Sequence, residues 1–600
     1  MRPLALLGLL LSLALGLSLA DGPAATETVK LNGHTFTVPA GFTIELAVKP
    51  GLVERPITVD LDEQGRLYVA DSSGSNAKVE LQLKERPHRI VRLEDTDGDG
   101  VYDRATVFAD KMMFPEGTLW HDGSLYVAAP PSIWKLTDTD GDGVADQRVE
   151  WFQGKTLTGC ANDLHGPYLG LDGRIYWAKG AFAKQSYKRS DGSEWGTRAA
   201  HIFRARADGT DVEPVMTGGM DNPVDVAFTP TGERVFTTTF FQHPAGGRRD
   251  GLVHAVDGGV YGKDHTPVYE HPWTSPQLMP VLTHMGPAAP AGLTRYESSV
   301  FGPGYQDSLF ATQFNLQKVS RHVLTPSGAT FVTADSDFVV SDNRDFHPTD
   351  VMEDADGSLL VIDTGGWYKL CCPSSQLVKA DIHGAIYRVR KKERGEGRRP
   401  ARAGTRLGER VGEAARRHPS GGRPAGHAPA RQERRRGPAG TGEGPPAERR
   451  LDRHPHRRPR SEGVRPQTAV RRGRRRPPGG STLRQPVARQ GRAVAGRGAA
   501  QPRLATGPPR PPPRRLGRLG DADAVPALLA ALRRPSDRFL EHSLTFALIE
   551  IANPEATAKG LSDSWPGARR AALIAAGPDA RRQARRRHGR ANRSPRPTPL

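Results

Sequence analysis

Two acidic runs have the residue types and the spacing of a calcium-binding loop. In LEDTDGDGVYDR the carboxylates stand at positions 1, 3, 5 and 9 of an EF-hand-like loop, and a glycine at position 6 permits the sharp turn. The run LTDTDGDGVADQ repeats this arrangement 43 residues later. The candidate metal ligands are Asp95, Asp97, Asp99 and Asp103 in the first loop and Asp138, Asp140, Asp142 and Asp146 in the second.

Both loops depart from the EF-hand pattern. Position 12 is Thr106 in the first loop and Val149 in the second, so the bidentate Glu is absent. The flanking runs IVRLE and RATVFA favour strands over helices. The alternative is a hairpin turn between outer strands of a sheet, in which Asp side chains cap their own backbone. Either arrangement can bind calcium weakly, as a stabilising ion outside any catalytic site.

A turn followed by a short β-rich run recurs six times and predicts the fold. The six phrases are DEQGRLYVAD at 62–71, HDGSLYVAAP at 121–130, LDGRIYWAKG at 171–180, TGERVFTTTF at 231–240, YQDSLFATQF at 305–314 and DADGSLLVID at 354–363. They repeat about every 58 residues, with no helical pattern between them, which favours a six-bladed β-propeller over residues 35–390. Two packed β-sandwiches are the alternative.

The strand ends of a propeller converge, so polar residues near the predicted strand ends are candidates for a site at the channel mouth. Lys179 and Lys369 are the cations of this set that could pair with cofactor carboxylates. For each residue the alternative is a solvated loop or a hydrogen bond between blades. The set comprises Arg55, Asn162, Asp163, Lys179, Gln242, His243, Gln313, Asn315, His347, Asp363 and Lys369.

The two ends of the predicted propeller differ sharply in composition. Residues 1–20 have the layout of a secretory signal peptide, so we expect a periplasmic or extracellular protein, with a retained N-terminal anchor as the alternative. Residues 391–520 hold 34 Arg and 2 Lys against 8 Glu and 1 Asp, so the +19 charge of the chain is concentrated there. This segment has almost no residues that could form a core, which predicts disorder.

Two explanations of the Arg-rich segment remain open. Phosphate contacts with nucleic acid are one, although the segment lacks aromatic residues for base stacking. A GC-rich gene read out of frame is the other, and it fits the abrupt return of helical spacing at 521–576, which looks like HEAT-type repeats. Residues 577–600 return to the Arg-rich, Pro-rich composition. The three cysteines, Cys160, Cys371 and Cys372, favour buried thiols, and no CxxCH motif is present for covalent haem.

Several long motifs together resemble a known family. They are FTIELAVKPGLVERPITVDLDEQGRLYVADSSGSN, the paired DTDGDG turns, MDNPVDVAFTPTGERVFTTTFF, DGLVHAVDGGVYG and DFHPTDVMEDADGSLLVIDTGGWYKLCCPSSQ. In this order they resemble the membrane-bound dehydrogenase family of planctomycetes and their relatives. Its propeller is similar to those of pyrroloquinoline-quinone-dependent glucose and sorbosone dehydrogenases. That family often continues into HEAT-type repeats and a cytochrome c domain, which is missing here.

The resemblance implies a site and a chemistry. It implies oxidation of a sugar or polyol, with pyrroloquinoline quinone as hydride acceptor, a bound calcium and a separate cytochrome c as a possible electron acceptor. His165, in NDLHGPYLGLDGRIYWAKG, resembles the catalytic His of these sugar dehydrogenases, although its spacing to the following turn is about three residues shorter. The implied base is therefore His165. Two other functions stay open: a non-catalytic propeller that binds glycans or proteins, and a lactonase-like, metal-dependent hydrolase.

Overall fold

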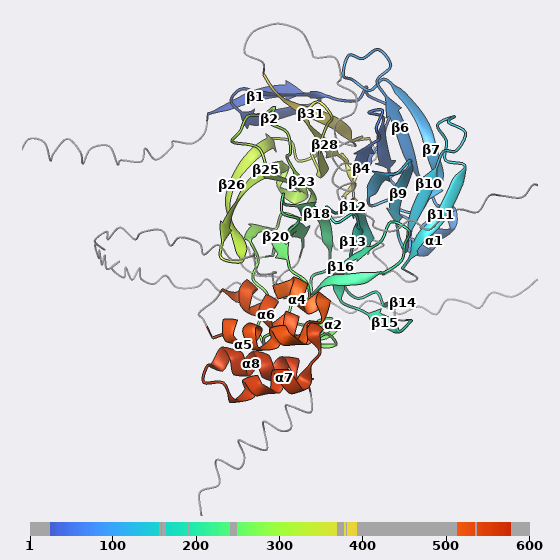
Figure 1. Cartoon of the computed structure of the whole chain (residues 1–600). Coiled ribbons are helices and arrows are strands. Elements are labelled where there is room, and N and C mark those ends of the chain that lie inside the picture. Colours follow the sequence, from blue (N-terminus) through green and yellow to red (C-terminus); the bar gives the residue numbers. More distant parts are fainter. Residues whose placement is uncertain are drawn as a thin grey trace, which may run out of the picture. The chain divides into compact units, whose positions relative to one another are not determined.

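In the described part of the chain, six sheets of four or more strands, mostly antiparallel, are arranged around a common axis (Figure 1). The computed structural model describes residues 25–154, 158, 164–188, 192–239, 249–368, 377–379, 381–392, 513–533 and 537–577. The six sheets are the blades of a β-propeller, which confirms the predicted all-β, six-bladed fold.

The first three blades follow the chain order from the inner to the outer strand. Blade 1 consists of β4 (Pro56–Leu61), β5 (Leu67–Asp71), β6 (His88–Glu94) and β7 (Arg104–Met112). Blade 2 consists of β8 (Thr118–His121), β9 (Ser124–Ala129), β10 (Ser132–Thr137) and β11 (Gln147–Gln153). Blade 3 consists of β12 (Leu164–Leu169), β13 (Ile175–Lys179), β16 (Ala200–Ala205) and β17 (Glu213–Gly218), with the short β21 (Val260–Tyr261) parallel to β17.

Blade 4 also follows the chain order, whereas blades 5 and 6 include strands from the N-terminal part of the chain. Blade 4 consists of β18 (Pro223–Phe228), β19 (Arg234–Thr238), β20 (Asp250–Ala255) and β22 (Thr283–Gly286). Blade 5 consists of β23 (Pro290–Arg295), β24 (Leu309–Gln313), β25 (Lys318–Ser327) and β26 (Thr330–Ser341), extended by β2 (His34–Pro39) and β1 (Thr26–Leu31). Blade 6 consists of β27 (Pro348–Glu353), β28 (Leu359–Asp363), β31 (Ala385–Lys391) and β3 (Phe42–Leu46). Because β3 comes from the N-terminal side, it closes the ring by pairing with β31.

Short elements interrupt the blades. Helix α1 (Val79–Glu85) lies between the second and third strands of blade 1, and α2 (Thr266–Tyr269) precedes β22. Two-stranded ribbons, β14 (Gln185–Lys188) with β15 (Glu194–Thr197) and β29 (Trp367–Tyr368) with β30 (Leu377–Val378), are inserted at the corresponding places in blades 3 and 6. These insertions account for the uneven spacing of the six sequence phrases.

The six phrases form the second strand of each blade. The turn before each strand needs a left-handed residue, which is glycine in five blades (for example Gly65, φ 75°, and Gly357, φ 79°) and Asp307 (φ 62°) in the sixth. The second strands are buried along their whole length because successive side chains enter different interfaces. In β5, Val69 packs between blades 6 and 1, whereas Tyr68 packs between blades 1 and 2. An apolar cluster of this kind fills each of the six blade interfaces.

The described residues after the propeller form short helices. These are α4 (Pro513–Leu519), α5 (Val525–Ala531), α6 (Arg538–Ile551), α7 (Pro554–Ala558) and α8 (Pro566–Ala575). Asp537 caps α6 by accepting a hydrogen bond from the backbone N–H of Leu540 at 2.9 Å, and Asn553 caps α7 in the same way at Ala556. The helical region therefore starts at α4, earlier in the chain than position 521, where the sequence pattern places it.

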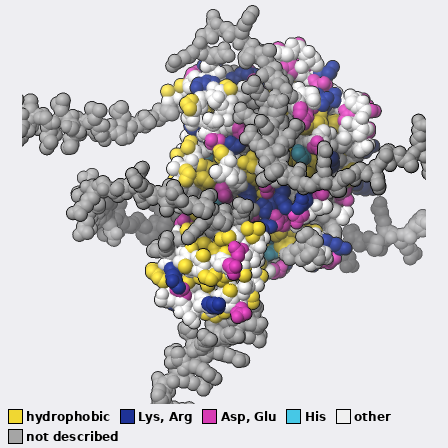
Figure 2. Space-filling model, in the orientation of Figure 1, with side chains coloured by type: hydrophobic (Ala, Val, Ile, Leu, Met, Phe, Trp, Pro, Cys, Tyr) yellow, Lys and Arg dark blue, Asp and Glu magenta, His cyan; other side chains and the backbone are white. Residues whose placement is uncertain are grey.

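Several sequence predictions fall on residues that are not described. They concern the signal peptide, most of the Arg-rich segment (393–512), the three cysteines and the C-terminal tail. On the face in Figure 2, acidic and basic side chains of the described residues are interspersed. None of the described helices is long and apolar enough to cross a membrane.

Candidate active site at the propeller axis

The inner strands form a closed ring around the axis. Each packs against the next, in the order β4, β8, β12, β18, β23 and β27, and β27 returns to β4. Pairing with the second strands aligns the six inner strands residue by residue. In five blades the position after the first paired residue, here called the entry position, is occupied by Ile57, His165, Val224, Ala291 and Thr349. In blade 2 the strand β8 starts only at Thr118, and the equivalent residue is Glu116, whose backbone N–H donates to the carbonyl oxygen of Ala128 at 2.8 Å.

Only two entry-position residues are ionisable, and they come from adjacent blades. Nδ1 of His165 in blade 3 lies 3.6 Å from Oε2 of Glu116 in blade 2. The Glu116 side chain is 4% exposed and that of His165 is 12% exposed. A carboxylate this close to an imidazole orients the ring. The distance is slightly beyond a hydrogen bond, as is common for catalytic pairs without substrate.

Two glycines allow this pair to form. A Cβ at Gly117 would stand 1.9 Å from the carbonyl oxygen of Gly166, so no side chain fits between the two inner strands. Gly166 also has φ +98°, in the region that favours glycine, next to an irregularity in the pairing of β12. In blades 2 and 3, therefore, the ionisable residue is followed directly by a glycine, and the backbones of these two glycines are in close contact. The dipeptides are Glu116-Gly117 and His165-Gly166. Sequence reasoning missed Glu116, although the shared pairing of an ionisable residue with glycine was the available signal.

The residue before the inner strand supplies further polar groups in blades 1 and 6. The backbone N–H of Arg55 donates to Oδ1 of Asp71 at 2.8 Å, and the Arg55 side chain is buried. In blade 6 the backbone N–H of His347 donates to Asp363 at 2.8 Å. Nδ1 of His347 lies 2.8 Å from the carbonyl oxygen of Gly365, and burial lowers the pKa of His347, so its ring is neutral at pH 7.

The other predicted cofactor residues make structural contacts. Lys179 is fully buried and its Nζ donates to the carbonyl oxygens of Gly180 (2.6 Å) and Ala199 (3.1 Å). Gln313 donates to Ser320 Oγ at 2.7 Å, and Asn315 donates to the carbonyl oxygen of Pro287 at 3.3 Å. Asn162, Asp163, Gln242, His243 and Lys369 lie outside the described residues.

Three aspartates on the inner strands, the half-buried Asp60 and the buried Asp225 and Asp350, were not singled out from the sequence. Each accepts a backbone N–H from the next blade: Asp60 from Trp120 (2.6 Å), Asp225 from Leu293 (2.7 Å) and Asp350 from Val59 (3.1 Å). Burial raises the pKa of Asp60 and of Asp350 to about 7. Burial, with Asp350 nearby, raises the pKa of Asp225 well above its usual range. The repeated phrase Pro-x-Asp-Val, in NPVDVAF and HPTDVME, was the signal in the sequence.

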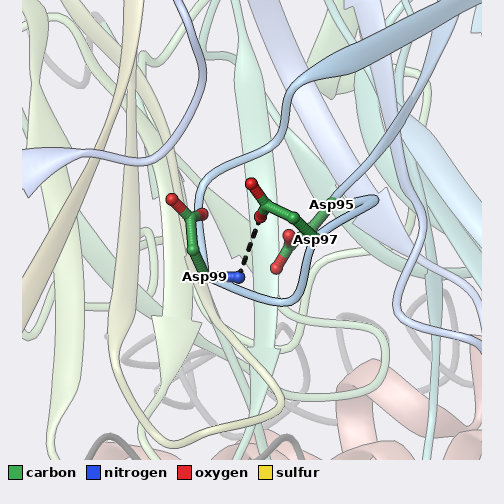
Figure 3. Close-up of side chains that lie close together, drawn as sticks. All are labelled: Asp95, Asp97 and Asp99. Atoms are coloured by element: carbon green, nitrogen blue, oxygen red, sulfur yellow. Dashed lines mark hydrogen bonds between the residues drawn. The ribbon is translucent and has the colours of Figure 1, made fainter.

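The acidic runs lie away from the axis, in hairpins between the third and outer strands of blades 1 and 2. Ligand oxygens of Asp95, Asp97 and Asp99 (Figure 3) lie within 4.8 Å of one another. Those of Asp138, Asp140 and Asp142 in the second loop do the same. Asp103 and Asp146 stand apart from these groups because each accepts hydrogen bonds from a threonine in its own loop.

The backbone of these loops is held as the structural alternative expects. Asp95 accepts the N–H groups of Gly98 (2.8 Å) and Gly100 (2.9 Å), and Asp97 accepts that of Asp99 at 3.1 Å. An Arg from the preceding blade contacts each loop: Arg388 donates to the carbonyl oxygen of Gly100, and Arg92 lies 3.9 Å from Asp138. The loops thus connect neighbouring blades, with three carboxylates in each close enough for one ion.

The fold and the inner-strand site define a six-bladed propeller with an ionisable pair at its axis. The model of a family described as a domain of unknown function, DUF7133, matches residues 29–398, so the chain belongs to that family. Among curated proteins, a search for similar sequences finds no match.

Solved structures of similar fold include two bacterial dehydrogenases. One, described as a putative oxidoreductase (glucose dehydrogenase) from Thermus thermophilus, is 18% identical with a TM-score of 0.40 and covers 58% of this chain and 99% of its own. The pyrroloquinoline-quinone-bound aldose sugar dehydrogenase from Streptomyces coelicolor is 13% identical with a TM-score of 0.38, covering 59% and 99%. A luciferin-regenerating enzyme, 14% identical with a TM-score of 0.35, covers 58% and 95%. Identities this low concern the fold and do not extend to activity.

Proposed function

We propose that this protein is an exported, quinone-dependent dehydrogenase that oxidises a sugar or polyol with His165 as the base. The observation that carries the proposal is the pair of His165 Nδ1 and Glu116 Oε2, 3.6 Å apart, at the entry position of adjacent blades. The motif resemblance supplies the substrate class and the acceptor. The proposal also covers the N-terminal signal peptide and a separate cytochrome c as electron acceptor.

In this proposal His165 accepts the proton of the substrate hydroxyl. Because Nδ1 faces Glu116, the other ring nitrogen, Nε2, takes the proton. Glu116 then stabilises the imidazolium that forms and holds the ring in the tautomer that leaves Nε2 as the acceptor. Both side chains are mostly buried, so their attraction is weakly screened by water.

The described residues fit part of what the cofactor needs. Arg55, whose Nη1 lies 3.3 Å from Oε2 of Glu54, would hold a carboxylate of pyrroloquinoline quinone, whereas Lys179 donates to two carbonyl oxygens. The cofactor, when bound, supplies the acceptor for the hydride that leaves the substrate carbon. Among the described residues, the acid groups able to hold a metal lie in the outer hairpins, so we assign any calcium there to stabilisation.

The test is reconstitution of the full chain with pyrroloquinoline quinone and calcium, followed by dye reduction with a panel of sugars and polyols. We expect dye reduction that depends on the quinone and that His165→Ala abolishes. The control variant Asp122→Asn, at an exposed turn position in blade 2, should leave dye reduction unchanged. Quinone binding without turnover on any substrate would favour a binding propeller instead. Lactone hydrolysis without quinone would favour the lactonase-like alternative.

A further inference from the structure

A pocket of about 380 Å³ lies over blade 6, at the end of the propeller where its inner strand begins. It is bounded by the turn between β1 and β2, by the connection from β3 to β4, and by the segment that enters β31. Blade 6 is opposite blade 3 in the ring, so this blade-6 pocket is separate from the His165–Glu116 pair. Its volume is within the range of small-molecule sites.

A buried carboxylate lines the pocket. Asp363 is 2% exposed, and its Oδ1 accepts the backbone N–H groups of His347 (2.8 Å) and Gly365 (2.9 Å). Its other oxygen, Oδ2, has no hydrogen-bond partner among the described residues. Burial raises the pKa of Asp363 to about 7, so a positive charge bound in the pocket would stabilise the ionised form of this carboxyl.

A buried histidine gives a second unsatisfied group. His34 is 8% exposed and its Nδ1 lies 3.1 Å from Ser341 Oγ. Its Nε2 has no hydrogen-bond partner within the described part of the chain, and the ring lines the pocket. Burial lowers the pKa of His34, so the ring is neutral at pH 7 and does not repel a cation.

The charges around the pocket favour a positive ligand. Lys379 forms an ion pair with Asp345, and Lys49 lies 3.5 Å from Asp103. Both lysines near the pocket are therefore balanced by acids. Asp363 and the exposed Asp381 have no such partner among the described residues.

Apolar residues also line the pocket, namely Leu46, Val48, Val53, Ile382 and Ile386. In the described residues, no three His or carboxylate ligand atoms of this pocket lie within 4.8 Å of one another, so the donors are too widely spaced for a single ion. A ligand with one charged end and an aliphatic body matches this mixed lining of acidic and apolar residues.

We infer that the blade-6 pocket binds a small organic cation, a protonated primary amine on a short aliphatic body. The ammonium meets the carboxylates of Asp363 and Asp381, and the aliphatic part packs against the partly exposed Leu46 and Ile382.

The test compares three probes of equal size with the full-length protein by ligand-observed NMR titration: butylammonium, butan-1-ol and butyrate. We expect butylammonium to bind at least tenfold more tightly than the alcohol, and butyrate not to bind. Asp363→Asn should weaken butylammonium at least tenfold, and Asp381→Asn severalfold. Asp122→Asn removes one carboxylate elsewhere and should change nothing.

Several results would overturn the inference. If butan-1-ol and butylammonium bind equally well, the pocket does not select for the positive charge. If butylammonium does not bind at all, the pocket is not an amine site. Unchanged affinity in both Asp363→Asn and Asp381→Asn would place the binding elsewhere. Because Asp381 is exposed, its variant tests the idea even if Asp363→Asn fails to fold. No quinone or turnover enters the assay, so the outcome is independent of the proposed function.

Discussion

Replacing Asp350 by Asn should remove a defined part of the pH dependence of stability. Burial raises the pKa of Asp350 from 3.8 to about 7. The folded protein therefore holds a proton on this carboxyl that the unfolded chain releases between pH 4 and 7. A group with a raised folded pKa contributes stability at low pH and loses it as the pH rises through the folded pKa.

The magnitude follows from the size of the shift. A difference of about three pKa units corresponds to roughly 4 kcal/mol, at about 1.4 kcal/mol per unit. The amide of Asn stays neutral at all pH values, so this contribution vanishes. Asp350 accepts hydrogen bonds from Val59 (3.1 Å) and Val351 (2.8 Å), one on each oxygen, and Asn keeps only one acceptor. The lost bond costs about 1 kcal/mol.

The assay is equilibrium urea unfolding of the full chain from pH 5 to pH 8.5, followed by tryptophan fluorescence. At pH 5 Asp350→Asn should already be slightly more stable than the parent, because ionisation of the unfolded parent carboxyl offsets the cost of about 1 kcal/mol for the lost hydrogen bond. The advantage of the variant should grow to about 3 kcal/mol as the pH approaches 7 and should level off above it, where the folded parent carboxyl is also ionised. Asp122→Asn should follow the parent at every pH. A difference between parent and Asp350→Asn that stays constant across this range would refute the raised pKa.

Three further predictions concern the inner strands and the acidic loops. Glu116→Gln should lower kcat about tenfold to hundredfold with little change in KM. It should also shift the pH profile of kcat to lower pH, because the His165 imidazolium loses its carboxylate partner. A pH profile identical to that of the parent would contradict the pairing. Gly117→Ala should lower the free energy of unfolding by about 3 kcal/mol, because its methyl group meets Gly166, whereas Gly304→Ala, with no atom within 4 Å, should be near neutral in the same urea titration. Millimolar calcium should raise Tm by a few degrees in differential scanning fluorimetry, and Asp97→Asn combined with Asp140→Asn should remove that rise; an equal rise in the double variant would place the ion elsewhere.

The propeller was predictable because its local signals are strong and repeat. Each second strand follows a turn that needs a left-handed residue, and glycine or aspartate marks it in the sequence. In each blade this turn is followed by a second strand that is buried along its whole length. The hairpin character of the DTDGDG loops followed from the strand-forming runs on either side, β6 with β7 and β10 with β11.

The site was less predictable because it depends on contacts between blades. Glu116 and His165 are 49 residues apart in sequence, and only closure of the ring brings Gly117 against Gly166. Lys179 looked available at the end of a strand, but its burial commits it to two carbonyl oxygens. The closing strand β3 and the addition of β2 to blade 5 likewise depend on partners more than 300 residues away.

The most direct test of the proposed function measures the base itself. The full-length protein, reconstituted with pyrroloquinoline quinone and calcium, is compared with His165→Ala in dye reduction and in quinone binding by absorbance titration. The account predicts that His165→Ala binds the quinone as the parent does but loses at least a hundredfold in kcat on every sugar or polyol that the parent oxidises. Equal turnover by parent and His165→Ala, or absence of quinone binding by the parent, would contradict it.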